Sequence, residues 1–349
     1  MASSHRPDKV DAIAADPAAD YRSFRARAAR RVVTIPTVGA AAVFLTLFVP
    51  VWVPVAVVVD LARVRFRLPV TRLMLFGLLW AWIEVAGLTL AFGAWLSGRG
   101  RDQELHYRLM AWWTNTLMTA LRTTTGLQID VGGDDALSTG DALVLSRHAS
   151  LGDSLVSAWV FLCQAGLRPR YVLKRELLSD PCLDVVGLRV PNYFLDREAS
   201  DGDAELAEIT DLARDLGERS VGVIFPEGTR SSPAKRERAL TIIAEHDEDR
   251  AREMRHLQHL LPPRPAGTRA LLAGAPEADL IFVWHTGFDG LDDFRGILDR
   301  LARRPHPAKV VARRVGRSEV PSDEEFDAWL DREWLRMDAV VDRELRRVR

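Results

Sequence analysis

Two long apolar runs near the N-terminus constrain the fold of this chain more than any other feature. Residues 38–59 contain no charged side chain, and residues 73–96 contain only one, Glu84. A helix of this length crosses a hydrocarbon core of about 30 Å, and core helices of soluble proteins are rarely so uniformly apolar. A cleavable signal peptide is disfavoured because the first run starts late, is too long and ends without a small-residue cleavage site. The sequence therefore predicts two membrane helices.

Arginines and prolines indicate how these helices meet the membrane. Arginines precede the first run, follow the second run and are frequent in the linker at 60–72. Two full crossings would place this basic linker on the opposite side of the membrane from both ends of the hairpin, against the positive-inside tendency. Pro50 and Pro54 flank Trp52 inside the first run; proline kinks a helix, and tryptophan prefers the interface. We therefore expect a hairpin embedded in one leaflet. A two-span anchor stays open, because kinked helices do cross bilayers. Glu84 is expected to pair with an arginine or to lie near a headgroup.

The composition of the whole chain narrows the function classes. The 47 Lys and Arg residues balance 48 Asp and Glu residues, so we expect no nucleic-acid partner, which would select a basic excess. The two cysteines, Cys163 and Cys182, exclude a disulfide framework and supply at most half of a zinc site. A reducing, cytoplasm-facing environment follows.

Four segments are predicted along the chain: a polar basic segment at 1–36, the membrane hairpin at 37–97, an α/β domain at 98–317 with a charged helical insert at 235–259, and a charged C-terminal helix at 318–349. The insert is expected to be a solvated helix or a lid. Large apolar residues recur every fourth residue over 105–121 (Leu105, Leu109, Trp113, Leu117 and Leu121), which predicts an amphipathic helix that either packs on the core or lies on the membrane.

Short apolar runs alternate with helical stretches after residue 126. Strands are expected at 127–131, 142–146, 171–173, 193–195, 221–225 and 280–284, and helices at 153–165, 203–217 and 326–348. This alternation predicts an α/β fold in which helices flank a mostly parallel central sheet. Ligands of such sheets bind beyond the carboxyl ends of the strands.

Ionisable residues follow four of these strands. They are His148, Lys174, Arg197 and the run at 225–231 (FPEGTRS). Each alone is ordinarily a solvated or structural residue, but their shared placement predicts one rim that carries a base and several cations. For His285, after the last strand, two roles stay open: lining the same rim, or the structural role that is the stronger expectation.

The first candidate pair is His148 and Asp153. A carboxylate in the first turn of a helix can fold back onto the imidazole, fix its tautomer and leave the other nitrogen free to take a proton. Such a dyad suits activation of a substrate hydroxyl. Serines at 146, 150 and 154 raise the alternative of a serine hydrolase, but the chain contains no G-x-S-x-G elbow.

The run FPEGTRS turns through proline and glycine and exposes a carboxylate, a hydroxyl and a guanidinium together. Arg230 offers a fork for a phosphate, Glu227 can accept hydrogen bonds from glycerol-like hydroxyls, and Gly228 lets a ligand approach the backbone.

Together with H-x₄-D (HASLGD at 148–153), this run resembles the glycerolipid acyltransferases typified by 1-acyl-glycerol-3-phosphate acyltransferase, over roughly residues 140–290. Residues 174–177 (KREL) and 191–197 (PNYFLDR) are similar to two further family elements, the second with Pro191 in place of its usual glycine. Arg147 stands where family members often carry asparagine. The fourth family motif is poorly matched at 280–285, whereas 259–267 is similar to the eukaryotic-like lysophosphatidate and lysocardiolipin acyltransferase branch.

The resemblance implies transfer of an acyl group from acyl-CoA or acyl-carrier protein to a lysophospholipid hydroxyl, with no cofactor and no metal. His148 would be the general base and Asp153 its orienting carboxylate. The acceptor's glycerol-phosphate would be held by a larger set: Lys174, Arg197, Glu227, Gly228, Thr229 and Arg230. The expected location is the cytoplasmic side of the inner membrane, where the lipid acceptor resides. The sequence leaves open other acceptors (glycerol-3-phosphate, glycolipids, transacylation) and a non-catalytic lipid-binding scaffold.

Overall fold

A computed structural model describes residues 21–196, 202–291, 293–303, 307–321 and 323–348. Within these ranges the core is a seven-stranded sheet in the order β1-β7-β6-β2-β5-β3-β4. The strands are β1 (Ile129–Gly132), β2 (Ala142–Ser146), β3 (Arg168–Lys174), β4 (Tyr193–Leu195), β5 (Ser220–Ile224), β6 (Asp279–Thr286) and β7 (Ala308–Val315). Every neighbouring pair is parallel except β6 and β7. The predicted α/β class with a mostly parallel sheet is confirmed.

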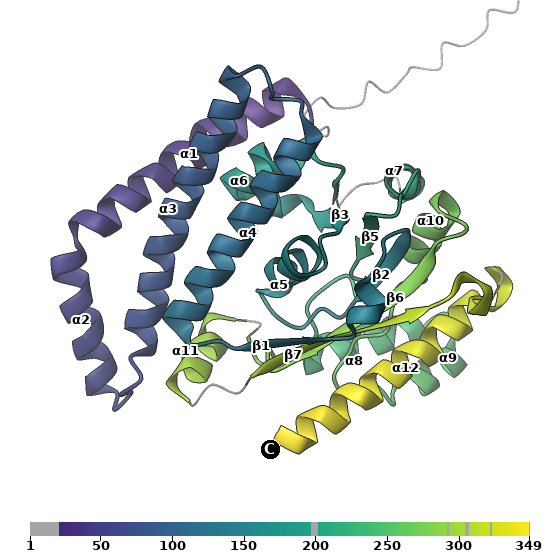
Figure 1. Cartoon of the computed structure of the whole chain (residues 1–349). Coiled ribbons are helices and arrows are strands. Elements are labelled where there is room, and N and C mark those ends of the chain that lie inside the picture. The colour runs from purple at the N-terminus through teal and green to yellow at the C-terminus, as the bar shows by residue number, and fades with distance from the viewer. Residues whose placement is uncertain (1–20, 197–201, 292, 304–306, 322, 349) are drawn as a thin grey trace, which may run out of the picture.

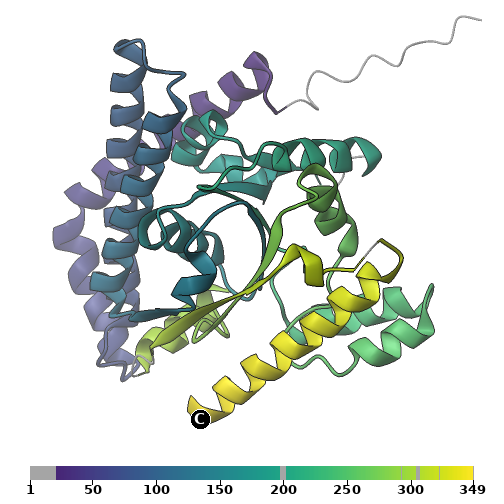
Figure 2. The ribbon, with the colours of Figure 1, turned by 45° about the vertical axis from the view of Figure 1, so that its right-hand side comes forward.

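The sequence explains the position of the central strand. All five residues of β2 are buried, as expected for a strand covered by helices on both faces. Helices α4 (Gln103–Thr125) and α5 (Asp153–Trp159) lie on the side of the sheet toward the N-terminal helices. The C-terminal helix α12 (Asp323–Val348) lies on the other side (Figures 1 and 2). The remaining helices of the domain are α6 (Pro181–Val185), α7 (Gly202–Ala213), α8 (Pro233–Ala244), α9 (Glu248–Met254), α10 (Pro265–Gly274) and α11 (Phe294–Ala302).

The N-terminal apolar segment forms three helices rather than two: α1 (Phe24–Leu47), α2 (Val49–Ala62) and α3 (Pro69–Leu96). The chain breaks at Phe48, just before Pro50, because proline lacks the N–H that would continue the helix. Trp52 is buried and donates its indole N–H to Leu45 O at 2.8 Å, so it packs inside this corner. Helices α1 and α3 are long and apolar enough to cross a membrane.

The far end of the hairpin is closed by a buried carboxylate. Asp60 accepts the backbone N–H groups of Val70 and Thr71 at 3.1 and 3.0 Å, which satisfies two free donors at the start of α3. The expectation for Glu84 is wrong: it is buried and accepts the indole N–H of Trp113 at 2.8 Å and the backbone N–H of Cys182 at 3.0 Å.

Ion pairs fasten both ends of the hairpin to the α/β domain. Near the start of α1, Arg30 and Arg31 each approach buried Asp184 on α6 at 2.7 Å. In the α2–α3 linker, Arg65 pairs with Asp299 on α11 at 2.8 Å. Between these ties α3 packs along α4, so the hairpin lies flat against the side of the domain (Figure 1).

Three other expectations are resolved by packing. The amphipathic stretch at 105–121 lies in α4 and packs between α3 and α5. The charged insert forms two helices, α8 and α9, and Arg250 of α9 pairs with Asp331 of α12 at 2.6 Å. The C-terminal helix buries Trp334, as its periodicity predicts. The sequence missed β7, and the C-terminal part of the helix expected at 153–165 is a π-helical turn at 160–164.

Candidate active site

The carboxyl ends of five neighbouring strands meet at one edge of the sheet, because β6, β2, β5, β3 and β4 are parallel. This edge carries three of the predicted groups: His148 after β2, the run 226–231 after β5, and Lys174 at the end of β3. Arg197, after β4, lies outside the described residues.

His148 and Asp153 form the predicted pair. His148 Nδ1 lies 2.9 Å from Asp153 Oδ2, and the histidine side chain is 15% exposed. No hydrogen bond from another described residue reaches Nε2. An imidazole held at one nitrogen by a carboxylate and open at the other has the arrangement of a general base.

The turn between the two residues holds the carboxylate. Asp153 Oδ2 also accepts the backbone N–H groups of Ala149 and Ser150 at 2.6 and 2.8 Å, and the Ser150 hydroxyl donates to Oδ1. Asp153 is the first residue of α5, where backbone donors and the helix dipole favour negative charge. Burial raises the pKa of Asp153, but the imidazoles of His285 and His148 outweigh burial and hold it below its usual range. Asp153 is therefore a carboxylate at neutral pH.

The main chain of His148 is fixed by the FPEGTRS run. Its N–H donates to Glu227 Oε1 at 2.7 Å, and its carbonyl accepts the N–H of Ser231 at 2.7 Å. Its ring packs against Phe225, with centroids 4.9 Å apart. The two motifs, separated by some seventy residues, thus form one site.

Glu227 has a different environment from the one expected. It is buried, and its second oxygen accepts the N–H of Leu261 at 2.8 Å, so both oxygens bind backbone amides of the protein. Burial raises its pKa to about 8, although these two N–H groups lower it. Its contacts describe a brace between His148 and the 257–264 loop rather than a ligand for acceptor hydroxyls.

The rest of the run faces the same edge. Gly228 has φ 67°, a left-handed conformation that favours glycine, and a Cβ there would lie 3.4 Å from Arg264 Nε. Thr229 Oγ1 accepts from Lys235 Nζ at 3.3 Å. Arg230 is half-buried and next to Ser231, whose N–H binds His148 O.

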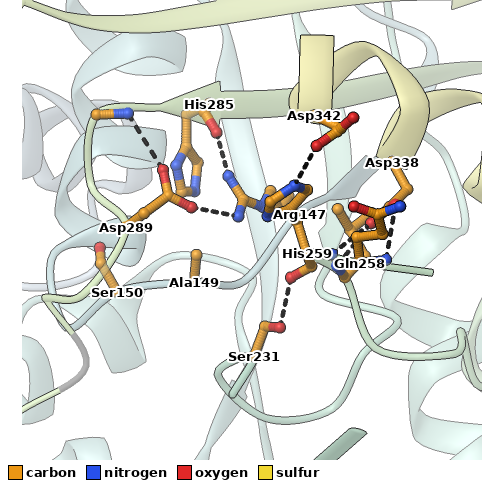
Figure 3. Close-up of polar contacts among 12 residues, drawn as sticks. Arg147, Ala149, Ser150, Ser231, Gln258, His259, His285, Asp289, Asp338 and Asp342 are labelled. Atoms are coloured by element: carbon orange, nitrogen blue, oxygen red, sulfur yellow. Dashed lines mark hydrogen bonds and ion pairs between the residues drawn. The ribbon is translucent and has the colours of Figure 1, made fainter. Parts of the chain in front are cut away.

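The 257–264 loop is anchored by the C-terminal helix (Figure 3). Asp338 accepts the N–H groups of Gln258, His259 and Leu260 at 2.8–2.9 Å. Trp334 Nε1 donates to Leu261 O at 2.9 Å. Because Leu261 binds Glu227, α12 supports the turn at 226–231 although no motif in it indicates a function.

Three residues that sequence reasoning did not assign to the site lie behind it. His285 Nε2 lies 3.2 Å from Asp153 Oδ1, without the alignment of a hydrogen bond. Arg147 is buried and donates to the carbonyl of His285 and to Asp289 Oδ1, the latter at 2.6 Å (Figure 3). The available signal was the position of His285 at the end of the strand beside β2.

An apolar cavity of about 450 Å³ opens beside the site, between the N-terminal helices and the α/β domain. It reaches the turn at 150–152 that joins His148 to Asp153. Its walls are mostly aliphatic and aromatic and include Phe76, Trp80, Leu117, Leu155, Ala158 and Leu173. Arginines at 67, 300 and 303 also line it. Such a cavity suits a flexible hydrocarbon chain.

No group of three or more His, Cys, Asp or Glu side chains with a metal-binding arrangement occurs in the part of the chain that the structure describes.

Comparison with known proteins agrees with the motifs. Residues 128–262 match the family model Acyltransferase. A solved structure similar to this chain is PlsC, the 1-acyl-sn-glycerophosphate (LPA) acyltransferase of Thermotoga maritima, at 15% identity and TM-score 0.47, covering 76% of this chain and 90% of that chain. The match to the family model spans His148, Asp153 and the FPEGTRS run. Residues 128–262 are therefore similar to the Acyltransferase family.

Proposed function

We propose that the protein transfers a fatty acyl group from an acyl thioester, acyl-CoA or acyl-carrier protein, to the free hydroxyl of a lysophospholipid, most simply 1-acyl-glycerol-3-phosphate. His148 Nε2 takes the hydroxyl proton as the oxygen attacks the thioester carbonyl. The new C–O bond forms, the C–S bond breaks, and the proton passes from His148 to the departing thiolate. The products are a diacyl phospholipid and the free thiol, and no acyl-enzyme is formed.

The observation that carries this proposal is the 2.9 Å contact of His148 Nδ1 with Asp153 Oδ2. Asp153, held as a carboxylate by three donors from the turn at 149–150, stabilises the imidazolium that forms when His148 takes the proton. A pair made of imidazole and carboxylate activates a hydroxyl that the substrate brings.

The acceptor phosphate is assigned to the cations at the same edge of the sheet. The strands beside His148 lead to Lys174, Thr229 and Arg230. Arg197 is included in this phosphate site only because it matches the family motif. Gly228 gives the phosphate access to the backbone. Glu227 acts through the main chain of His148 rather than by contact with the glycerol.

The acyl chain is assigned to the 450 Å³ cavity, because its apolar walls begin at the turn that carries the catalytic pair. A chain lying there places its carboxyl end near His148.

Membrane attachment is assigned to the outer face of the hairpin, where Val33, Phe44, Val55 and Phe92 are exposed. Because both ends of the hairpin are tied to the α/β domain, a full crossing would draw that domain into hydrocarbon. This favours insertion into one leaflet, with the site at headgroup level. Acyl-CoA and acyl-carrier protein are cytoplasmic, which favours the cytoplasmic face of the inner membrane.

The test uses purified full-length protein in mixed micelles with radiolabelled acyl-CoA or acyl-carrier protein and a panel of lysophospholipids, glycerol-3-phosphate and a glycolipid. We expect transfer to a lysophospholipid, and His148→Ala and Asp153→Asn should each lower kcat by about 10²–10⁴-fold while the protein remains folded. Absence of transfer to every acceptor by folded wild-type protein would contradict the proposal and leave a lipid-binding scaffold. Near-normal turnover of His148→Ala would place the base elsewhere.

A further inference from the structure

His285 is a buried histidine that the reaction described above does not use. Its side chain is 4% exposed, and neither ring nitrogen makes a hydrogen bond to a described residue. A buried polar ring without partners is rare, because it loses its hydrogen bonds to water and gains none in return. The only carboxylate within ion-pair distance of its ring, among the described residues, is Asp153, with Nε2 3.2 Å from Oδ1.

Asp153 is thereby flanked by two imidazoles. Oδ2 faces His148 Nδ1 at 2.9 Å, and Oδ1 faces His285 Nε2. His285 cannot itself reach a substrate, since it does not line the cavity and is covered by protein. Its route to the reaction is through the carboxylate.

The backbone around His285 is held by a second ion pair. Arg147 connects the end of β2 to β6: its N–H donates to Val283 O at 2.9 Å and its guanidinium to His285 O. The guanidinium also binds Asp289 Oδ1 at 2.6 Å, and Asp289 Oδ2 accepts the N–H of Gly287 at 3.3 Å (Figure 3). Arg147 is therefore directed away from the substrate side and fixes the strand that carries His285.

We propose that His285 is a positioning residue for the catalytic pair: it donates its Nε2–H to Asp153 Oδ1, holds Oδ2 toward His148 and takes a share of the negative charge of the carboxylate. The two atoms already lie within hydrogen-bond distance at 3.2 Å, and catalytic hydrogen bonds often tighten when substrate binds. The proposal rests on the proposed acyl transfer.

The effect on His148 follows from the charges around the pair. The ionisable groups that face His285 are Asp153 on α5, Arg147 at the end of β2 and Asp289 after β6; His148 and Glu227 lie on the other side of Asp153. With one donor fewer, Asp153 would direct more negative charge toward His148 and hold its protonated form more strongly. The imidazole would then act as a base only at higher pH, and it would also be less well oriented.

The test compares three variants of the full-length protein. His285→Leu removes the donor at similar volume, and His285→Gln keeps a donor. His106→Leu is the matched control, because His106 is also buried with an unbonded Nε2 but lies on α4, away from Asp153. For His285→Leu we expect kcat to fall by about 10- to 100-fold with acceptor KM within twofold. We also expect the acid limb of the pH–rate profile to move up by about 0.5–1 pH unit. His285→Gln should stay within about threefold of wild type, and His106→Leu should not move the profile.

A second readout does not need turnover. Carbethoxylation of His148 by diethyl pyrocarbonate, located by peptide mass spectrometry across pH, should show the same upward displacement in His285→Leu. Wild-type protein that transfers no acyl group would contradict the proposed acyl transfer. If the modification curve of His148 still moves in His285→Leu, the coupling of His285 to His148 through Asp153 is supported all the same. The inference is overturned if folded His285→Leu shows an unchanged modification curve and an unchanged kcat. It is also overturned if folded His285→Gln loses as much kcat as His285→Leu. If His285→Leu does not fold, native-like kcat and modification in His285→Gln supports the inference, and a tenfold loss there overturns it.

Discussion

Glu227 Oε1 accepts the backbone N–H of His148 at 2.7 Å, so the glutamate of one motif holds the histidine of the other. Its second oxygen holds Leu261 in the same way. A buried acidic residue of the FPEGTRS run therefore braces two loops through their backbone amides.

Glu227→Gln is expected to change how stability depends on pH. Burial raises the pKa of Glu227 to about 8, above its value in an unfolded chain, so between about pH 4.5 and 8 the folded state binds more protons than the unfolded state. Wild-type protein should therefore lose stability as pH rises through this range, by an amount on the order of 1–3 kcal/mol. Glutamine does not titrate, so the difference in Tm between wild type and variant should shrink from pH 5 to pH 8.5 in detergent. A difference independent of pH would show that Glu227 titrates alike in both states.

Arg230→Ala should weaken binding of the acceptor. Loss of a charge-assisted contact with phosphate should raise the acceptor KM by about tenfold or more and leave the donor KM within twofold. Initial rates with each substrate varied in turn measure both constants. Arg252→Ala serves as the control, because Arg252 is exposed and pairs with Glu248 and Asp249 of its own helix, so its loss should leave both KM values unchanged. Equal increases for donor and acceptor would remove Arg230 from the acceptor site.

Ala158→Phe should shorten the acyl chains that the enzyme accepts. Ala158 is buried and lines the apolar cavity, so a phenyl ring there fills space that a long chain would occupy. Because each methylene left in water costs about 0.8 kcal/mol, kcat/KM for C16 donors or acceptors should fall by about 10- to 100-fold. The C8 substrates provide the internal control and should be used nearly as well as before. A parallel loss for C8 and C16 chains would indicate disturbed packing and would argue against the cavity as the acyl site.

Charges on the outer face of the hairpin should release the protein from membranes. Val55 and Phe92 are 57% exposed on α2 and α3, so changing both to Asp should cost little folding energy but disfavour insertion. Flotation with phosphatidylglycerol-containing vesicles should show at least a roughly tenfold lower bound fraction than wild type. Ile242→Asp is the control, because Ile242 is 53% exposed on α8, away from the hairpin. Unchanged flotation of the double variant would show that another surface binds the lipid.

The sequence predicted those parts of the molecule whose signals are local. The apolar runs predict the hairpin, and the four-residue gap between His148 and Asp153 lets one tight turn bring them together. The helix break at Phe48 follows from Pro50. The division into three helices also depends on the hydrogen bond from Trp52 to Leu45, which fixes the corner between α1 and α2 and is not visible in the sequence. Strand β7 was missed because Lys309, Arg313 and Arg314 interrupt it, so it lacks the continuous apolar run by which the other strands were recognised.

Long-range partners could not be predicted from motifs. The residue types in FPEGTRS indicate what Glu227 could bind, but whether its oxygens face a ligand or backbone amides depends on how the 257–264 loop folds over it. His285 is similar: only the pairing of β2 with β6 brings it to Asp153.

The support that α12 gives to the catalytic loop also has a consequence for biosynthesis. Asp338 and Trp334, which anchor residues 258–261, are made long after the hairpin has left the ribosome. In the function proposed above, the hairpin is therefore synthesised and able to meet lipid before the turn at 226–231 can be braced, so the proposed reactive centre is the last part of the molecule to be completed.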